Sequence, residues 1–191
     1  MTRTDIINTL IKKYNYKTYL EIGVQNGKNI NKIECRRKTG IDPDKNTLKF
    51  FPGCFIKTSD DFFKENRQTF DIIFIDGLHE FKQTLIDISN SLKVLNKNGT
   101  IVCHDMLPPD ENHQKVPRIQ AQWTGDCWKA WVILRGTRAN LDMQVINTDY
   151  GCGIIKKGAQ KVIEYDALTW QSFVKNKHQW MNIVEPENWI P

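Results

Sequence analysis

The sequence lacks the features that mark several broad classes of protein. No apolar run approaches the roughly 18–20 residues that a membrane-spanning helix needs, which argues against a membrane protein. The segment 1–13 has no apolar stretch of signal-peptide length before charged residues resume, so we expect a cytoplasmic location. The formal net charge is +5, but no run of five or more basic residues occurs. An anionic partner is therefore permitted, whereas nucleic-acid binding is not indicated.

Two common kinds of motif are also absent. The five cysteines are scattered and none forms a C-x-x-C pair, so neither a zinc site nor a disulfide framework is indicated. We expect reduced cysteines that pack as small hydrophobic residues. The dinucleotide fingerprint G-x-G-x-x-G is missing as well, which argues against an enzyme that binds a pyrophosphate.

What is present is the pattern of one α/β domain. A chain of 191 residues is most simply a single domain, and 40% hydrophobic residues suffice for a core. Strand patterns alternate with helix patterns, which predicts βαβ units and a parallel sheet. The first helix is expected behind a cap at Thr4 or Asp5. In the first half of the chain, the expected elements are strands at 19–22, 39–41, 54–57, 70–75 and 100–103, and helices at 4–15, 29–34, 46–51, 60–66 and 81–95.

The second half of the chain has a different pattern. The polar, proline-containing segment 107–122 has no clear periodicity and is longer than a routine connection, so it is either functional or poorly ordered. Helices are expected at 128–134 and 168–183, and strands at 143–147 and 152–156 are expected to form a hairpin. The expected fold class is α/β, with a doubly wound, mostly parallel sheet, helices on both faces and a C-terminal antiparallel hairpin.

Residues with useful chemistry gather at the ends of the expected strands. In an open α/β sheet the ligand binds outside the carboxyl ends of the strands. One acidic residue in such a place is usually a helix cap. A series of strand ends that all carry polar or glycine residues indicates a ligand site instead. In strand order, these residues are Glu21, Gly23 and Gly27, then Asp42, then Ser59 and Asp60, then Asp76 and His79, then His104 and Asp105.

The turn after the first expected strand combines an acidic residue with two glycines. Gly23 and Gly27 allow positive φ angles and a close approach of the backbone to a ligand. Glu21 suits a ligand that carries positive charge. Asp42, about twenty residues further on, can accept two hydrogen bonds from ribose hydroxyls. The alternative interpretation of Glu21 and Asp42 is helix capping or solvation.

The ordered set of motifs resembles a known family. The motifs E-I-G-x-x-x-G, G-I-D, F-D-x-I-F-I-D-G-x-H and N-G-T-I-V-x-H-D, within residues 15–106, are similar to those of class I (Rossmann-like) S-adenosylmethionine-dependent methyltransferases. The segments 125–131 and 148–155 resemble the small-molecule and sugar O-methyltransferase branch. The resemblance implies one methyltransferase domain over the whole chain, with a cofactor-binding half at 1–106 and an acceptor-side half at 107–191.

The resemblance implies roles for the residues at the first three strand ends. Glu21 and the turn Gly23–Gly27 would hold the methionine portion of S-adenosylmethionine. Asp42 would bind the ribose hydroxyls, and Ser59 and Asp60 would line the adenine pocket.

The fourth and fifth strand ends resemble those of metal-dependent O-methyltransferases that act on catechols. By that resemblance, Asp76 and His79 contact the cofactor and take part in catalysis, with His79 as the general base that accepts the hydroxyl proton. Asp76, His104 and Asp105 would hold a divalent metal ion. An all-oxygen site suits Mg²⁺ best, whereas a histidine ligand favours Mn²⁺, iron or another transition ion. The alternatives are that His79 only bonds Asp76 and that Asp105 only anchors the following loop.

The expected function is methyl transfer from S-adenosylmethionine to a hydroxyl group of a sugar or small metabolite, with a divalent metal as a second cofactor. A nucleic-acid methyltransferase and a non-catalytic S-adenosylmethionine-binding module are the alternatives. Dispersed lysines and the absence of an N-P-P-aromatic motif argue against the first alternative. The joint presence of Asp76, His79 and Asp105 argues against the second. The expected partner is a small hydroxyl acceptor, and a homo-oligomer is left open.

The tryptophan-rich segment after residue 122 offers candidates for the acceptor side. Trp123 is the candidate to stack on an acceptor, whereas at least one of Trp128 and Trp131 is expected in the core. Gln114–Arg118 is interpreted as either a lid or a dimer contact. His113 is expected at the surface.

Overall fold

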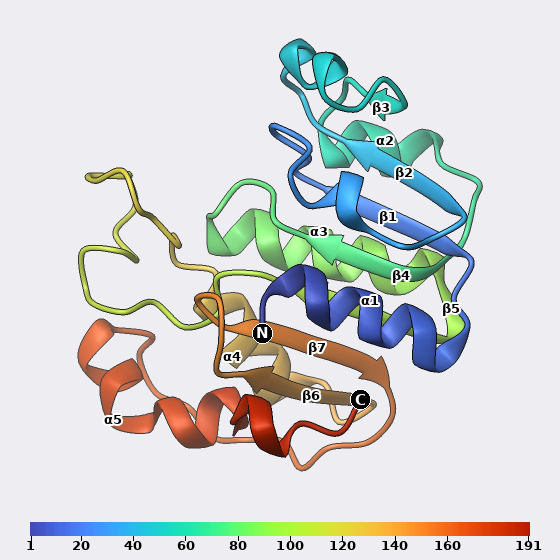
Figure 1. Cartoon of the computed structure of the whole chain (residues 1–191). Helices are drawn as coiled ribbons and strands as arrows, with labels where there is room; N and C mark the ends of the chain where they lie inside the picture. The colour runs from blue at the N-terminus through green and yellow to red at the C-terminus, as the bar shows by residue number, and fades with distance from the viewer.

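The computed structural model describes residues 1–191 and is built on one 8-stranded sheet (Figure 1). The strand order is β3-β2-β1-β4-β5-β7-β6-β8. All strands run in one direction except β7, which pairs antiparallel with both β5 and β6. The predicted α/β fold class, with a doubly wound, mostly parallel sheet and an antiparallel hairpin, is confirmed. The strands are β1 (Thr18–Ile22), β2 (Arg37–Ile41), β3 (Cys54–Phe55), β4 (Phe70–Ile75), β5 (Leu95–Cys103), β6 (Leu141–Ile146), β7 (Cys152–Lys157) and β8 (Ile183–Val184).

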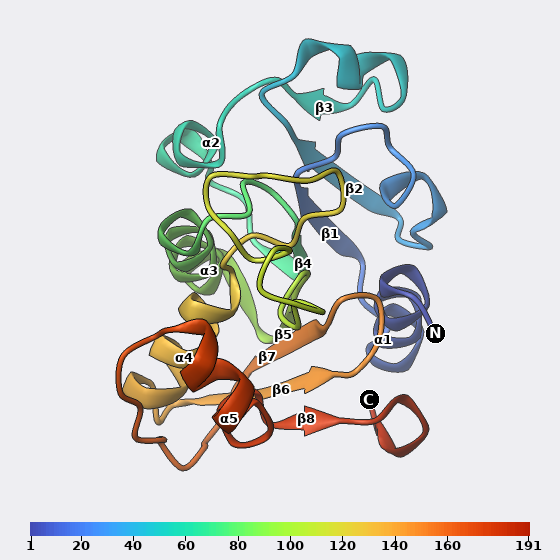
Figure 2. The ribbon, with the colours of Figure 1, turned by 90° about the vertical axis from the view of Figure 1, so that its left-hand side faces the viewer.

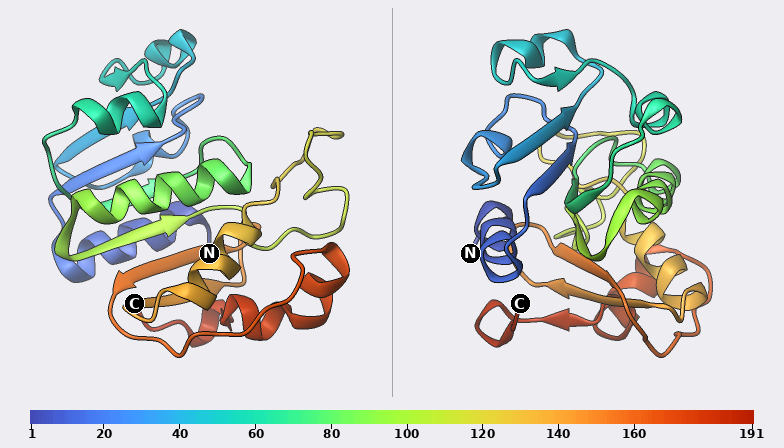
Figure 3. Two further views of the ribbon diagram at one scale, coloured as in Figure 1. Left: turned by 180° about the vertical axis from the view of Figure 1, so that it is seen from behind. Right: turned by 90° about the vertical axis from the view of Figure 1, so that its right-hand side faces the viewer.

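Helices cover both faces of the sheet in unequal numbers. One face carries α1, and the other carries α2, α3, α4 and α5, whose apolar side chains join a larger core cluster. Figure 2 shows α1 and α3 on opposite sides of the sheet, and Figure 3 shows α2, α3 and α4 on the face turned away in Figure 1. No helix has both the length and the apolar character that crossing a membrane requires. The helices are α1 (Arg3–Tyr14), α2 (Ser59–Glu65), α3 (Phe81–Val94), α4 (Trp128–Thr137) and α5 (Trp170–Met181).

The sequence of β4, F-D-I-I-F-I, shows why this strand lies at the centre. Ile73 and Ile75 join the core cluster beneath α2–α5, whereas Ile72 and Phe74 join the cluster beneath α1. A parallel strand that is covered by helices on both faces needs apolar residues at successive positions rather than alternating ones. The nearly continuous apolar run therefore specifies a strand that is buried on both sides.

The structure differs from the expected elements mainly in short segments. The helices predicted at 29–34 and 46–51 are 3-10 helices, Ile30–Lys32 and Lys45–Lys49. The second is capped by Asp44, whose side chain accepts a hydrogen bond from a backbone amide of the turn at 2.9 Å. Segments this short close little more than one turn, for which 3-10 geometry is common.

Strand β5 begins at Leu95, earlier than expected. The pair Asn98-Gly99, which falls between the helix expected at 81–95 and the strand expected at 100–103, therefore lies inside the strand. Two contacts from distant residues hold it there: the Tyr16 hydroxyl donates to the Asn98 carbonyl at 2.7 Å, and the Asn96 side-chain amide donates to Asp71 at 2.6 Å. Tertiary contacts thus override a local turn preference.

Helix α1 begins at Arg3, ahead of the expected cap. Thr2 is the cap: its hydroxyl accepts a hydrogen bond from the Asp5 amide at 3.3 Å, and the Asp5 carboxylate accepts one from the Thr2 amide at 2.8 Å. This reciprocal pair is a capping box. The predicted cap at Thr4 or Asp5 is therefore wrong, and Arg3 lies in the first turn of the helix.

Candidate active site

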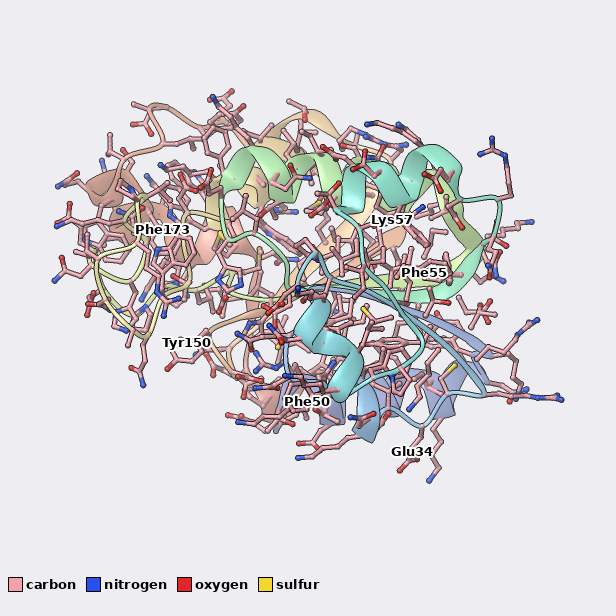
Figure 4. All side chains as sticks on the ribbon, turned by 90° about the horizontal axis from the view of Figure 1, so that it is seen from above. Glu34, Phe50, Phe55, Lys57, Tyr150 and Phe173 are labelled. Carbon is pink, nitrogen blue, oxygen red and sulfur yellow. The ribbon has the colours of Figure 1, made fainter.

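A cavity of about 690 Å³ opens at the carboxyl ends of the central strands. Its wall also includes residues from α1, from the segment 106–126 and from the turn between β6 and β7. Figure 4 labels two lining residues from distant parts of the chain, Lys57 before α2 and Tyr150 in the β6–β7 turn. Segments that are far apart in the sequence therefore share one cavity.

The hydrogen-bond ladder of the sheet aligns the predicted strand-end residues. The Gly23 amide donates to a carbonyl at the end of β2 at 2.9 Å, and the Asp76 amide donates to one at the end of β1 at 2.9 Å. The His104 amide donates to a carbonyl at the end of β4 at 3.0 Å. Each bond continues the parallel pairing one residue beyond its strand. Strand-end residues are therefore brought into a row, as a parallel sheet requires.

Asp42 is held at the cavity wall by two backbone amides. It is 8% exposed, and its carboxylate accepts hydrogen bonds from the Gln25 amide at 2.7 Å and the Asp44 amide at 2.8 Å. These bonds orient the carboxylate. Each carboxylate oxygen still has capacity for a further hydrogen bond from a ligand.

Ser59 and Asp60 line the cavity from the first turn of α2, where Gln83 of α3 joins them. The Gln83 side-chain amide lies 3.3 Å from the Ser59 hydroxyl and 3.1 Å from Asp60, and it donates to Asp87 at 3.0 Å. Burial raises the pKa of Asp87 to about 6. Gln83 and Asp87 were not predicted from the sequence. Their signal was a polar pair spaced four residues apart in an amphipathic helix.

Glu21 and Gly27 do not line the cavity. Glu21 is 1% exposed, and its carboxylate accepts hydrogen bonds from the Tyr19 hydroxyl and from the Asn29 side-chain amide, the latter at 2.8 Å. Tyr19 belongs to the core cluster beneath α1, so Glu21, two residues further along β1, shares that face. Burial raises the pKa of Glu21 to about 7.

The two predicted glycines both have positive φ angles, of 89° at Gly23 and 69° at Gly27. A side chain at Gly23 would collide with the backbone carbonyl of Asp76. Glycine is therefore required where the ends of β1 and β4 approach each other. Gly23 lines the cavity, whereas a side chain at Gly27 would press on Asn31 and Phe50 outside it.

The fourth and fifth strand ends form a compact cluster of two carboxylates and two imidazoles. Asp76 Oδ1 lies 3.2 Å from Nε2 of His79 and 3.3 Å from Nδ1 of His104. Asp105 Oδ2 lies 3.0 Å from Nδ1 of His79, and its Oδ1 lies 3.1 Å from Nδ1 of His104. Carboxylates and imidazoles therefore alternate around the cluster. The structure thus brings together all four residues that the sequence placed there.

The pKa values in the cluster follow from this crowding. Burial acts to lower the pKa of His79, but the carboxylates of Asp76 and Asp105 outweigh it and raise that pKa. Burial opposes protonation of His104 in the same way, and the surrounding carboxylates, Asp76 first, raise its pKa well above the usual range. Burial acts to raise the pKa of Asp76, yet the two histidines hold it well below its usual range. The cluster therefore favours protonated imidazoles beside ionised carboxylates.

The donor set of this cluster fits a divalent transition ion. Ligand atoms of Asp76, His79 and Asp105 lie within 4.8 Å of one another, and His104 contacts both carboxylates. Adjacent ligands around a six-coordinate ion with bonds of about 2.1 Å are roughly 3 Å apart, which matches the contacts in the cluster. Two imidazoles with two carboxylates suit Mn²⁺ or iron better than Mg²⁺. His79, expected to contact the cofactor and to act as the base, is thus also placed to act as a ligand.

Two charged residues next to this cluster, Arg3 and Asp149, were not predicted from the sequence. Arg3 Nη1 lies 2.6 Å from Nε2 of His104 and 3.6 Å from Oδ2 of Asp76. Asp149, in the β6–β7 turn, lies 3.4 Å from Nε2 of His104. The motif at 148–155 contained a signal for Asp149. Arg3 carried no local signal, because its contacts come from residues that are remote in the sequence.

The irregular segment holds His79 from the side opposite to Asp76. The His79 ring stacks on Trp123 with a centroid distance of 5.4 Å, and its Nδ1 lies 3.1 Å from the Trp123 carbonyl oxygen. Gly125 has a φ of 62°, and a side chain there would collide with the His79 carbonyl. The segment is therefore packed against His79 rather than loosely ordered.

The remaining expectations for this region have mixed outcomes. Trp128 and Trp131 are both fully buried, so the prediction of core packing is confirmed. His113, predicted as a surface residue, is half-buried. Its imidazole contacts Asp110 at 2.9 Å and stacks beside Tyr150, because the irregular segment folds back towards the β6–β7 turn.

Comparisons with known proteins agree with the fold. Residues 20–106 match the family described as a methyltransferase domain. No curated protein sequence matches this chain.

Solved structures with the same fold include several methyltransferases. PaMTH1 from Podospora anserina, bound to S-adenosylhomocysteine, has a TM-score of 0.65 and 14% identity, with 81% of this chain and 77% of that chain covered. The O-methyltransferase TomG from Streptomyces achromogenes, in complex with S-adenosylmethionine, has a TM-score of 0.63 and 12% identity, with 82% and 80% covered. The N-methyltransferase NodS from Bradyrhizobium japonicum has a TM-score of 0.55 and 17% identity, with 83% and 95% covered.

The structural likeness establishes the fold, which is the class I, Rossmann-like fold of methyltransferases that use S-adenosylmethionine. Within that fold, residues 20–106 match a methyltransferase domain.

Proposed function

We propose that this protein transfers the methyl group of S-adenosylmethionine to a hydroxyl oxygen of a small molecule, such as a sugar. The observation that supports this best is the position of His79 between the carboxylates of Asp76 and Asp105, in the same cavity that carries Asp42. A neutral imidazole within reach of a bound hydroxyl is a usual means of removing its proton. The likeness to TomG, an O-methyltransferase, supports oxygen as the acceptor atom.

In this proposal S-adenosylmethionine occupies the end of the cavity near Asp42. Asp42 accepts hydrogen bonds from the ribose hydroxyls, and Ser59 and Asp60 face the adenine. Asp76, at the centre of the row of strand ends, contacts both the cofactor and His79. Glu21 lies behind the turn Gly23–Gly27, where its carboxylate, when ionised, favours the cationic methionine portion of the ligand.

The chemical step requires a neutral His79. Its Nδ1 lies between two acceptors, Asp105 and the Trp123 carbonyl, so we propose that Nδ1 keeps its proton and Nε2 is the base. The cationic sulfonium beside Asp76 favours loss of the Nε2 proton. The acceptor hydroxyl then gives its proton to Nε2 while its oxygen attacks the methyl carbon. The carbon–sulfur bond breaks, its electron pair stays on sulfur, and S-adenosylhomocysteine leaves. The protein contributes mainly alignment of the two reactants.

A divalent ion is the second part of the proposal. Asp76, His104 and Asp105 would hold it, since Nδ1 of His104 lies 3.3 Å from Asp76 and 3.1 Å from Asp105. Such an ion, when bound, lowers the pKa of a coordinated hydroxyl. Because its ligand His104 must give up a proton, metal binding should release protons to the solvent.

Calorimetric titration with S-adenosylhomocysteine, with and without Mn²⁺ or Mg²⁺, tests the cofactor assignment. A panel of sugar and phenolic acceptors, assayed for methyl transfer beside the variant His79→Gln, then tests the reaction. Absence of S-adenosylhomocysteine binding would reject the proposal. Binding without turnover on any acceptor would favour a binding module, and salt-dependent affinity for RNA or DNA would favour a nucleic-acid methyltransferase.

A further inference from the structure

Helix α1 places a guanidinium inside the carboxylate–imidazole cluster. Arg3 Nη1 lies 3.0 and 2.6 Å from the two ring nitrogens of His104 and 3.6 Å from Oδ2 of Asp76. Arg3 Nε lies 3.8 Å from Oδ2 of Asp149. A side chain with a permanent positive charge therefore lies among atoms that would also attract a metal ion.

Backbone contacts fix the start of α1 at this place. The Arg3 amide donates to Asp149 at 2.9 Å, and the Thr148 hydroxyl donates to the Met1 carbonyl at 2.6 Å. Thr2 caps the helix in a reciprocal pair with a residue of its first turn. None of these bonds uses the Arg3 guanidinium. The helix can therefore stay docked on the β6–β7 turn when the Arg3 side chain is replaced.

Apart from Arg3, the cavity wall contains one further lysine or arginine, and that residue already has an acidic partner. Lys57 lines the cavity but forms an ion pair with Glu65. Arg3 is therefore the basic residue that faces Asp76 and Asp149. The charge of the carboxylates nearest to the proposed metal position is thus already partly neutralised by the chain itself.

We infer that Arg3 is a built-in competitor of the divalent ion and limits how tightly this cluster binds metal. The inference rests on the metal site proposed above. A guanidinium and a metal ion repel each other at such short range, and both draw on the negative charge of Asp76. Metal can enter only when the Arg3 side chain withdraws towards the open cavity, which its half-exposed position allows. Arg3 thereby acts as a positioning residue that couples metal occupancy to the N-terminal helix.

Titration of the full-length protein with Mn²⁺, followed by the electron paramagnetic resonance signal of the free ion, tests the inference without an acceptor. The variants are Arg3→Met, which keeps an unbranched apolar stem, and Arg3→Ala. Lys12→Met is the matched control, since it removes one positive charge from an exposed position of the same helix. We expect Arg3→Met and Arg3→Ala to bind Mn²⁺ at least about tenfold more tightly than the wild type. Lys12→Met should match the wild type.

The double variant Arg3→Met with Asp76→Asn should lose the increase in Mn²⁺ affinity that Arg3→Met shows. That loss would place the bound ion at Asp76, in the cluster. Equal or weaker Mn²⁺ affinity in both Arg3 variants, in protein that melts like the wild type, would overturn the inference. An equal gain in Lys12→Met would also overturn it, because the effect would then be one of overall charge. S-adenosylhomocysteine affinity, measured on the same samples, tests the proposed function separately. Absence of that binding would reject the proposed function, whatever the Mn²⁺ titrations show.

Discussion

The proposed cofactor end of the cavity and its proposed acceptor end are built from different kinds of chain segment. At the proposed cofactor end, Asp42, Ser59 and Asp60 follow successive parallel strands, and Asp42 is oriented by nearby backbone amides. At the acceptor end, His79 meets Trp123 from the irregular segment, and the cluster beside it is completed from α1 and the β6–β7 turn. The first end repeats one local arrangement, a parallel strand followed by polar residues. The second end depends on the docking of segments that are remote in the sequence. Changes at the two ends should therefore have separable effects on binding and turnover.

The largest effect should come from breaking the acceptor end alone. Replacing His79 by Gln removes the proposed base but keeps a planar, polar side chain. We expect turnover to fall roughly 10²–10⁴-fold, as loss of a general base does, while S-adenosylhomocysteine affinity stays near the wild-type value. Initial rates and calorimetry on the same sample make the comparison. Full turnover in His79→Gln would show that the cluster has a structural role only.

The next largest effect concerns Glu21, which is buried behind the proposed cofactor end, and the dependence of protein stability on pH. The pKa of Glu21 is raised from its ordinary value of 4.5 to about 7 by burial, so the folded state binds a proton that the unfolded state releases. The contribution of protonated Glu21 to the free energy of unfolding is fully present below about pH 4.5. It falls by roughly 3 kcal/mol as the pH rises through 7.

Comparison of the wild type with Glu21→Gln isolates this contribution. Subtracting the urea-unfolding free energies of the two proteins at several pH values removes the shared titration of other groups, including Tyr19, Asp76 and Arg3, which face Glu21. The difference should fall between pH 4.5 and 7. A flat difference would mean that Glu21 ionises normally in the folded protein.

A smaller effect should follow from breaking the cofactor end at Asp42. Loss of charge-assisted hydrogen bonds typically amounts to about 1.5–3 kcal/mol, so Asp42→Ala should weaken S-adenosylhomocysteine binding roughly 10–100-fold. Asp44→Ala is the matched control, because Asp44 is an exposed carboxylate two residues away that lies outside the cavity wall. If both variants bind like the wild type, the ribose assignment fails.

The smallest effect should come from the stack behind His79. An aromatic pair contributes about 0.5–1.5 kcal/mol beyond its buried area, so Trp123→Ala should lower turnover by about 2–10-fold. Trp123→Phe should recover most of the loss, because it restores a ring against the imidazole. S-adenosylhomocysteine affinity should not change in either variant. An effect on affinity alone would move Trp123 to the cofactor end.

Much of the fold was predictable because its signals are local. The apolar run at 70–75 predicts a central strand, and the ladder of a parallel sheet then aligns whatever follows each strand. For that reason Asp42, Asp76 and His104 could be grouped before any distance was known. Boundaries were less predictable, as the early start of β5 at Leu95 shows, because long-range side-chain contacts decide them.

The position of Glu21 follows from the alternation of side chains along β1, a local signal that the strand-end pattern alone does not use. Tyr19 and Glu21 are two residues apart in a strand, so their side chains share a face. Tyr19 is a core residue of the face beneath α1, and Glu21 is therefore buried beside it rather than exposed in the cavity. Alternation along β1 could have placed Glu21 behind the turn.

The sequence by itself determined the βα order, the buried central strands and the row of polar residues at the strand ends, because each depends on periodicity over a few residues. Only the tertiary structure decided that Arg3 and Asp149 join His104, and that Trp123 holds His79. Those contacts form where the start of α1 and two loops meet at the carboxyl ends of the strands. Their free energy comes from groups far apart in the chain, so no local pattern of residues encodes them.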